Sequence, residues 1–158
     1  MMKLNNKISG LIFIILLAAS APVFSGGKDT ENDVFCRAME YSKHGDLKNA
    51  EREFNKASRP NQKEARFNLG ICYYQSKDYD RALREFKRVQ KLDNKYSLAY
   101  YYEGLASEIK FIEKNRKGMR KNALAAWENY LKYADKSDVQ RIKYAREHLD
   151  ALKAGTPK

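Results

Sequence analysis

The chain is poor in the residues that build turn-rich, metal-binding or catalytic proteins. Three prolines and eight glycines among 158 residues disfavour a turn-rich β protein and suit long helices. Neither of the two histidines lies near a cysteine or the other histidine in sequence, which gives no metal-ligand spacing. The motifs HExxH, GxSxG and GxxxxGK[ST] do not occur. We therefore expect a non-enzymatic protein that uses no metal or cofactor.

The composition is that of a folded domain with a basic surface. Hydrophobic residues make up 43% and charged residues 32%, which indicates a globular rather than a disordered chain. Thirty-one basic against 20 acidic residues give a formal net charge of +11, and 11 tyrosines and seven phenylalanines supply many rings. Such a chain is large enough for one compact domain.

The N-terminus has the order of a secretory signal. Lys3 and Lys7 precede the apolar run Leu11–Ala19, and small residues with Pro22 follow it. We expect residues 1–25 to be a signal peptide, cleaved after Ser20 or Ser25, with residues 26–30 as a linker. The alternative is an uncleaved anchor facing the periplasm, although the run is shorter than the roughly 20 residues that span a bilayer. The expected location is a bacterial periplasm.

Five spaced positions recur three times along the rest of the chain. At each of the five positions, most of the three copies carry the same kind of residue, which is small at two positions and aromatic at three. The aligned sets are Phe35, Phe67 and Tyr101; Ala38, Gly70 and Gly104; Tyr41, Tyr73 and Ser107; Ala50, Ala82 and Ala123; and Phe54, Phe86 and Trp127. The spacings of three and four within each half predict two helices per unit, in which small residues allow close approach and rings fill the space between.

This pattern resembles the tetratricopeptide repeat family, a helix–turn–helix unit of about 34 residues with L-G-x2-Y and A-x3-F. Leu69, Gly70 and Tyr73, then Ala82 and Phe86, match it literally. The resemblance implies an all-α, right-handed α-solenoid of three repeats, over residues 31–62, 63–96 and 97–135. A capping helix over 137–153, with Ser137 or Asp138 as N-cap, and a tail over 154–158 complete it.

The third repeat carries an insertion. Gly104 and Ala123 are seven residues further apart than Gly70 and Ala82, and the extra residues lie near the basic segment 110–121. Either the first helix is about two turns longer or the turn is a longer basic loop. We expect the helix to continue to about Asn115, with a turn near Gly118.

The resemblance also implies where a partner binds. In this family the first helices line a concave surface that holds a peptide, and the inward positions here are mostly aromatic or aliphatic. They are Phe35, Met39, Phe67, Asn68, Ile71, Tyr74, Tyr101 and Leu105. Any one of them can instead belong to the core between repeats.

A second candidate surface is basic. Between residues 110 and 121 six cations accompany one acid, Glu113; they are Lys110, Lys114, Arg116, Lys117, Arg120 and Lys121. Such a surface suits an anionic membrane, an acidic envelope polymer or an acidic protein, and the alternative is a solvated segment. Nucleic acid is a poor candidate, because the signal directs the chain out of the cytosol and no nucleic-acid motif is present.

Two cysteines lie on the first helices of neighbouring repeats. In an oxidising compartment Cys36 and Cys72 are a candidate disulfide that would join repeats one and two. Alternatively, Cys72 is a small buried apolar residue.

Two functions follow as hypotheses. The first is an exported adaptor that binds a peptide segment or surface of another envelope protein in its concave groove, as a scaffold in assembly or secretion. The alternative is a structural or oligomerisation module that docks to another copy of itself or to an anionic membrane surface.

Overall fold

The computed structural model describes residues 31–56, 62–114 and 117–155. The predicted signal peptide (1–25), the linker (26–30) and the end of the tail (156–158) lie outside these residues. Within them the chain forms seven helices and no strand. The helices are α1 (Glu31–Lys43), α2 (Leu47–Lys56), α3 (Gln62–Gln75), α4 (Tyr79–Leu92), α5 (Ser97–Lys114), α6 (Lys117–Tyr133) and α7 (Val139–Ala154).

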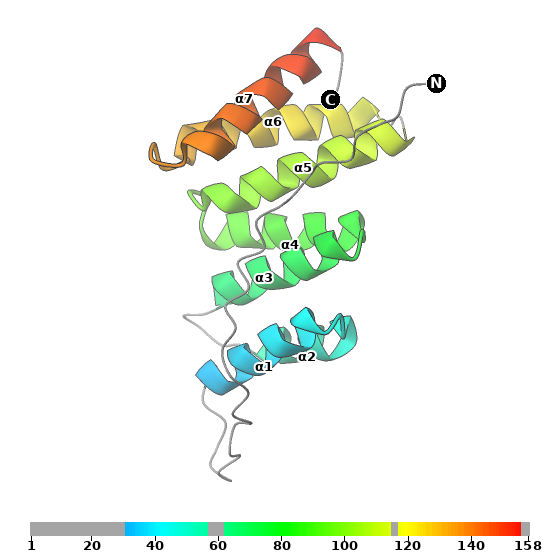
Figure 1. Ribbon diagram of the computed structural model, residues 1–158, viewed down its shortest axis with the longest axis vertical. Coiled ribbons are helices and arrows are strands. Elements are labelled where there is room, and N and C mark those ends of the chain that lie inside the picture. Colours follow the sequence, from blue (N-terminus) through cyan, green and yellow to red (C-terminus); the bar gives the residue numbers. More distant parts are fainter. Residues whose placement is uncertain (1–30, 57–61, 115–116, 156–158) are drawn as a thin grey trace, which may run out of the picture.

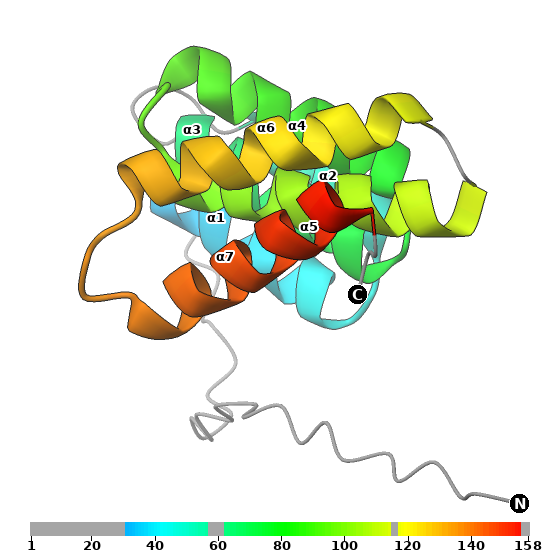
Figure 2. The ribbon, with the colours of Figure 1, turned by 90° about the horizontal axis from the view of Figure 1, so that it is seen from above.

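The helices stack as pairs along one axis. The closest packing is within the pairs α1–α2, α3–α4 and α5–α6, and each pair also contacts the next helix in the chain. Figure 1 shows the pairs following one another along the long axis of the molecule, with α7 at the far end. Seen along this axis, α7 crosses α5 at an angle beside α6 (Figure 2). The prediction of an all-α solenoid of helix pairs is confirmed.

Small residues set the distance between the helices of a pair. A Cβ atom on Gly70 of α3 would lie 2.6 Å from Cε1 of Phe86 on α4, and one on Gly104 of α5 would lie 2.8 Å from the Trp127 indole on α6. Both rings are fully buried. The alternation of small and aromatic residues in the sequence therefore arises because each of these rings packs against the backbone of a glycine on the other helix of its pair.

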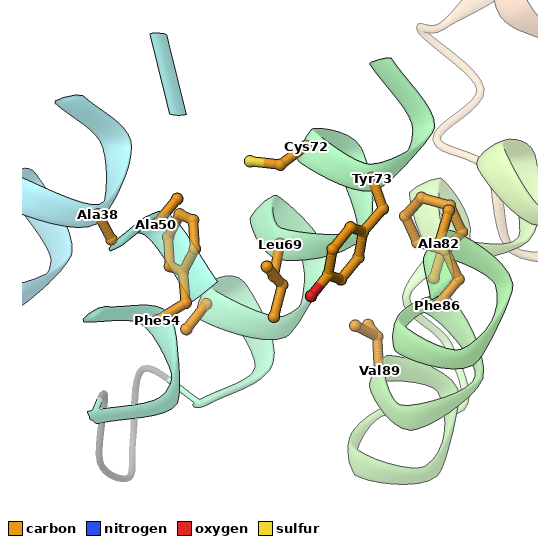
Figure 3. Packing of buried hydrophobic residues seen from close by; sticks show 11 residues of the cluster. Ala38, Ala50, Phe54, Leu69, Cys72, Tyr73, Ala82, Phe86 and Val89 are labelled. Atoms are coloured by element: carbon orange, nitrogen blue, oxygen red, sulfur yellow. The ribbon is translucent and has the colours of Figure 1, made fainter. Parts of the chain in front are cut away.

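The interior forms two apolar clusters. One joins the first two repeats and ends at Ala99 of α5, and the other joins the third repeat to α7. In Figure 3, Leu69 and Tyr73 of α3 lie between Phe54 of α2 and Phe86 of α4, so that one row of side chains links two repeats. Each repeat therefore buries apolar surface both within itself and against its neighbour.

Acidic residues begin three of the helices, and one of them, Asp138, is a cap that the sequence predicted. Backbone N–H groups of Asn49, Arg81 and Arg141 donate to Asp46, Asp78 and Asp138, at 3.1, 3.0 and 3.4 Å. Each carboxylate satisfies an N–H of the first turn that has no partner within the helix. Hydrogen bonding to Asn49 and to Arg81 lowers the pKa of Asp46 and Asp78 respectively.

The extra residues of the third repeat are helical on both sides of the turn. Helices α5 and α6 have 18 and 17 residues, whereas α3 and α4 have 14 each. Helix α5 ends at Lys114, close to the expected Asn115, and α6 begins at Lys117, so the turn lies slightly before the expected Gly118. Gly118 lies in the first turn of α6 and does not interrupt the helix. A Cβ atom at this position would contact no other described residue.

Two acids on the second helices of the repeats are buried. Glu53 on α2 and Glu85 on α4 each precede the ring of their helix and are 2% and 5% exposed. Each is paired with an arginine from the first helix of its own repeat, Arg37 at 3.2 Å and Arg66 at 3.4 Å. These ion pairs repeat from one unit to the next and link the two helices beside the ring.

Candidate functional site

The predicted groove residues share one face of the stack, formed by α1, α3 and α5, which we call the first-helix face. All eight are half-buried. Phe35, Met39, Phe67, Ile71 and Tyr74 pack against the cluster of the first two repeats, and Tyr101 and Leu105 pack against the cluster of the third. Each of these side chains thus contributes to the interior and keeps part of its surface exposed. Asn68 lies among them, and its Nδ2 donates to the Glu64 carbonyl at 2.9 Å.

Rings form an unbroken band across this face. Phe67 of α3 contacts Tyr102 of α5 at 5.7 Å between ring centroids, and Tyr102 contacts Tyr101 at 5.5 Å. Tyr101 in turn contacts Tyr144 of α7 at 6.1 Å. Edge-to-face and tilted pairs at these distances are favourable beyond their area burial. The band therefore joins three helices that are far apart in sequence into one surface.

Burial keeps the hydroxyl groups of three tyrosines on and beside the band protonated at physiological pH. Burial raises the pKa of Tyr74 to about 12, with further contributions from neighbouring tyrosines, Tyr79 first. Burial likewise raises the pKa of Tyr101 to about 12 and that of Tyr144 above its ordinary value. The rings thus present apolar surface with polar tips, a combination enriched at protein interfaces.

A guanidinium group lies at the α7 end of the band. Arg141 is placed over the Tyr101 ring at 5.9 Å, and its Nη1 is paired with Asp138 at 2.6 Å. A cation over a ring is a favourable arrangement and holds the side chain beside the band.

The structure brings two residues to this face that the sequence did not single out. Tyr144 stacks on His148 at 4.0 Å, and His148 Nδ1 lies 2.9 Å from both carboxylate oxygens of Glu108 on α5. Trp127 Nε1 donates to the same carboxylate at 3.2 Å. Helix α7 lies across α5 (Figure 2), and only 12% of the His148 side chain stays exposed where the two helices cross.

The three described cations of the predicted basic surface at 110–121 differ in exposure. Lys110 is 2% exposed and pairs with Asp80, because the long α5 extends past the beginning of α4. Arg120 donates to the carbonyl of Leu152, at 2.6 Å from Nη2, and so caps the C-terminal end of α7. Lys121 is exposed. The side chains of Lys114, Arg116 and Lys117 lie outside the described residues.

The candidate disulfide is not formed in the structure, where both cysteines are free. Cys72 is buried and hydrogen-bonded to the Ser42 hydroxyl, whereas Cys36 is exposed. Ser42 lies six residues beyond Cys36 on α1, about 9 Å along a helix axis. The α1 residue that faces Cys72 is therefore Ser42, and Cys36 is out of reach. Burial raises the pKa of the Cys72 thiol.

The described residues contain neither a cluster of side chains that could ligate a metal nor a helix long and apolar enough to cross a membrane. A recess of about 290 Å³ at the α3–α4 turn has a polar lining, which includes Lys110 and Asp80. It lacks the apolar anchors of the first-helix face.

Stacked antiparallel helix pairs, closed by a seventh helix and with rings along one face, define a helical repeat protein. The sequence model of the tetratricopeptide repeat family matches residues 63–96, which are the α3–α4 pair. The pairs α1–α2 and α5–α6 carry the same small and aromatic positions. The α3–α4 pair is therefore a tetratricopeptide repeat, a module that generally mediates protein–protein interaction, and it stands in a stack of similar helix pairs. No curated protein was found to match the chain.

Proposed function

We propose that the protein is an exported, non-enzymatic adaptor that binds a peptide segment or surface of another envelope protein on its first-helix face. The observation that carries the proposal is the band of partly exposed rings from Phe67 through Tyr102 and Tyr101 to Tyr144. Rings held in place by neighbouring rings lose little conformational entropy on binding.

The chemistry of the face indicates the kind of segment that it accepts. Ile71 and Leu105 supply aliphatic contacts beside the rings, and the tyrosine hydroxyls stay protonated. An extended or helical peptide with apolar anchors suits such a face, since its side chains contact the rings and its polar groups meet the hydroxyls. Arg141 at one end favours an acidic residue in the corresponding part of the ligand.

The binding face can be tested by substituting a charged residue at half-buried aliphatic positions. A protein recovered with the full chain from its own cells would be titrated against purified Ile71→Lys and Leu105→Lys chains. We expect each substitution to weaken binding by at least tenfold, because removing the lysine ammonium from water into an apolar contact is unfavourable. The matched control is Val139→Lys on α7, which starts from an apolar side chain that is already 67% exposed.

Retained affinity in both face variants, with helical circular dichroism unchanged, would contradict this proposal. Analytical ultracentrifugation of the same chains tests the alternative of self-association. A parent dimer that the two face variants dissociate and the control does not would identify a second copy as the occupant of the face.

Export rests on the sequence pattern of residues 1–25, and its test is independent of the binding face. Fractionation of cells that express the full chain, followed by mass spectrometry, is expected to find a periplasmic protein that begins at Ala21 or Gly26. A chain in the cytosol that retains residues 1–25 would refute export, and an intact chain in the membrane fraction would support the anchored form.

A further inference from the structure

The outward side of α4 carries a row of exposed cations. Arg84, Lys87, Arg88 and Lys91 are spaced by three and four residues, which places them on one face of the helix, and all four are exposed. Seven residues of helix span about 10 Å. This face is distinct from the first-helix face, to which α4 contributes no residue of the ring band.

Two of the acids beside this row are turned inward. Glu85 is 5% exposed and is held by Arg66 and Arg88, at 3.4 and 2.5 Å. Glu103 is 8% exposed and accepts from Gln90, with Lys87 at 4.0 Å. Asp80, in the first turn of α4, is exposed and pairs with Lys110. Beyond this first turn, the charge that α4 presents to solvent is positive.

An exposed apolar side chain lies at the end of the row. Leu92 is 47% exposed and follows Arg88 by four residues, so that it occupies the same side of the helix. Lys95, in the turn that follows, is also exposed. A cationic helix face that ends in an exposed leucine has the composition of a segment that lies in the interface of a membrane.

We propose that this α4 face docks on an anionic lipid bilayer. The four cations meet lipid phosphates, and Leu92 enters the boundary between headgroups and acyl chains. The exposed Leu92 favours a bilayer over a soluble polyanion as the partner, because only a bilayer offers this side chain an apolar phase. The assignment moves the predicted anionic-surface contact from residues 110–121 to α4.

Vesicle flotation with the full chain tests the proposal. Because the apolar N-terminal run binds neutral and anionic vesicles alike, the readout is the ratio of affinities for phosphatidylglycerol-containing and pure phosphatidylcholine vesicles. The test variant is Arg84→Gln, Lys87→Gln and Lys91→Gln together. The control is Lys136→Gln, Lys143→Gln and Arg146→Gln, which removes the same charge from other exposed positions.

Each cation near an anionic surface strengthens binding on the order of fivefold, so the α4 variant should lower the ratio about 100-fold. The control should lower it only a few-fold through net charge. Leu92→Ala should also weaken binding, and the fold-change relative to the parent chain should be the same at low and high salt.

Equal losses in the α4 variant and the control would overturn the proposal, because net charge alone would then explain binding. So would loss of binding in a Lys114→Gln, Lys117→Gln and Lys121→Gln chain while the α4 variant binds normally. A parent chain that binds polyglutamate but shows no preference for anionic vesicles would also overturn it, in favour of an acidic polymer.

Discussion

At the scale of the residue, two glycines and the rings that they contact decide how closely helices pair. Gly70 and Gly104 are fully packed against Phe86 and Trp127, and their role is steric, since both lie inside regular helices. Helical glycine is otherwise unfavourable relative to alanine. The close approach of the helices therefore outweighs the lower helix propensity.

Gly70→Ala should destabilise the chain. The new Cβ would lie 2.6 Å from the Phe86 ring, so the helices of the second repeat must separate, and we expect a loss of about 1–3 kcal/mol in the free energy of unfolding. Urea denaturation followed by circular dichroism measures it. Gly118→Ala is the control: no side chain or backbone atom lies within 4 Å of its Cβ position, and it should stabilise the chain by up to about 1 kcal/mol. Equal effects at both sites would refute the steric role of Gly70.

Glu103→Gln should stabilise the chain at neutral pH. Burial raises the pKa of Glu103, so folding favours its protonated form. The contribution of this group to stability is full below the pKa of the unfolded chain, roughly 4.3, and is lost as the pH rises through the raised value in the folded chain. A glutamine keeps an acceptor for Gln90, which donates at 2.6 Å.

The measurement is urea unfolding of parent and variant at pH 7 and near pH 4. The variant should be more stable at pH 7, and the difference should shrink toward pH 4. Glu128→Gln, at an exposed position, should show no such trend. A variant that is less stable at pH 7 would show that the charge of Glu103 is needed.

At the scale of the element, α7 is held on the third repeat by polar contacts as well as by its apolar stripe. His148 faces Glu108 of α5, and Arg120 of α6 caps the last turn of α7. The buried carboxylate of Glu108 depends on His148 and Trp127, because an uncompensated acid in the interior is strongly unfavourable.

His148→Ala should loosen α7. It leaves Glu108 with Trp127 as its remaining donor among the described residues, and we expect a loss of about 3 kcal/mol in unfolding free energy. Urea unfolding followed by Trp127 fluorescence reports the change at the site itself. His44→Ala removes another histidine–glutamate pair, with Glu40 at 3.1 Å, but that pair is exposed and its loss should not measurably change stability. Similar effects of the two substitutions would contradict a role of the pair in docking α7.

At the scale of the whole molecule, the stack is stabilised by contacts between neighbours, so the first repeat is held from one side only among the described residues. Cys72 lies at this boundary, buried against Ser42 of α1. Its accessibility therefore reports separation of the first repeat from the stack.

A thiol reagent should modify the two cysteines at different rates. We expect rapid reaction of Cys36, which is exposed, and slow reaction of Cys72, because it is buried and its raised pKa keeps the thiol protonated. Low urea concentrations should accelerate the slow phase before global unfolding. Mass spectrometry of peptides assigns each phase. Absence of both phases in the unreduced chain would instead reveal a disulfide.

The described fold was predictable because its signals are local. The small residues at 38, 70 and 104 and the rings at 54, 86 and 127 recur at fixed spacings, and Asp46, Asp78 and Asp138 cap helices through bonds that span three residues. The predicted site was harder to assess, since Phe67 and Tyr101 are both part of the core and part of the surface. The two interpretations of these residues, as groove and as core, are therefore both compatible with the structure.

The sequence by itself determined that helix pairs form, where they begin and which side chains separate them, since each depends on residues a few positions apart in the chain. Only the tertiary structure decided that Lys110 is buried, that Ser42 rather than Cys36 meets Cys72, and that Tyr144 and His148 join the first-helix face. These depend on how far α5 extends past α4 and on the angle at which α7 crosses α5. Both are set by the packing of many side chains at once, which no short segment of sequence encodes.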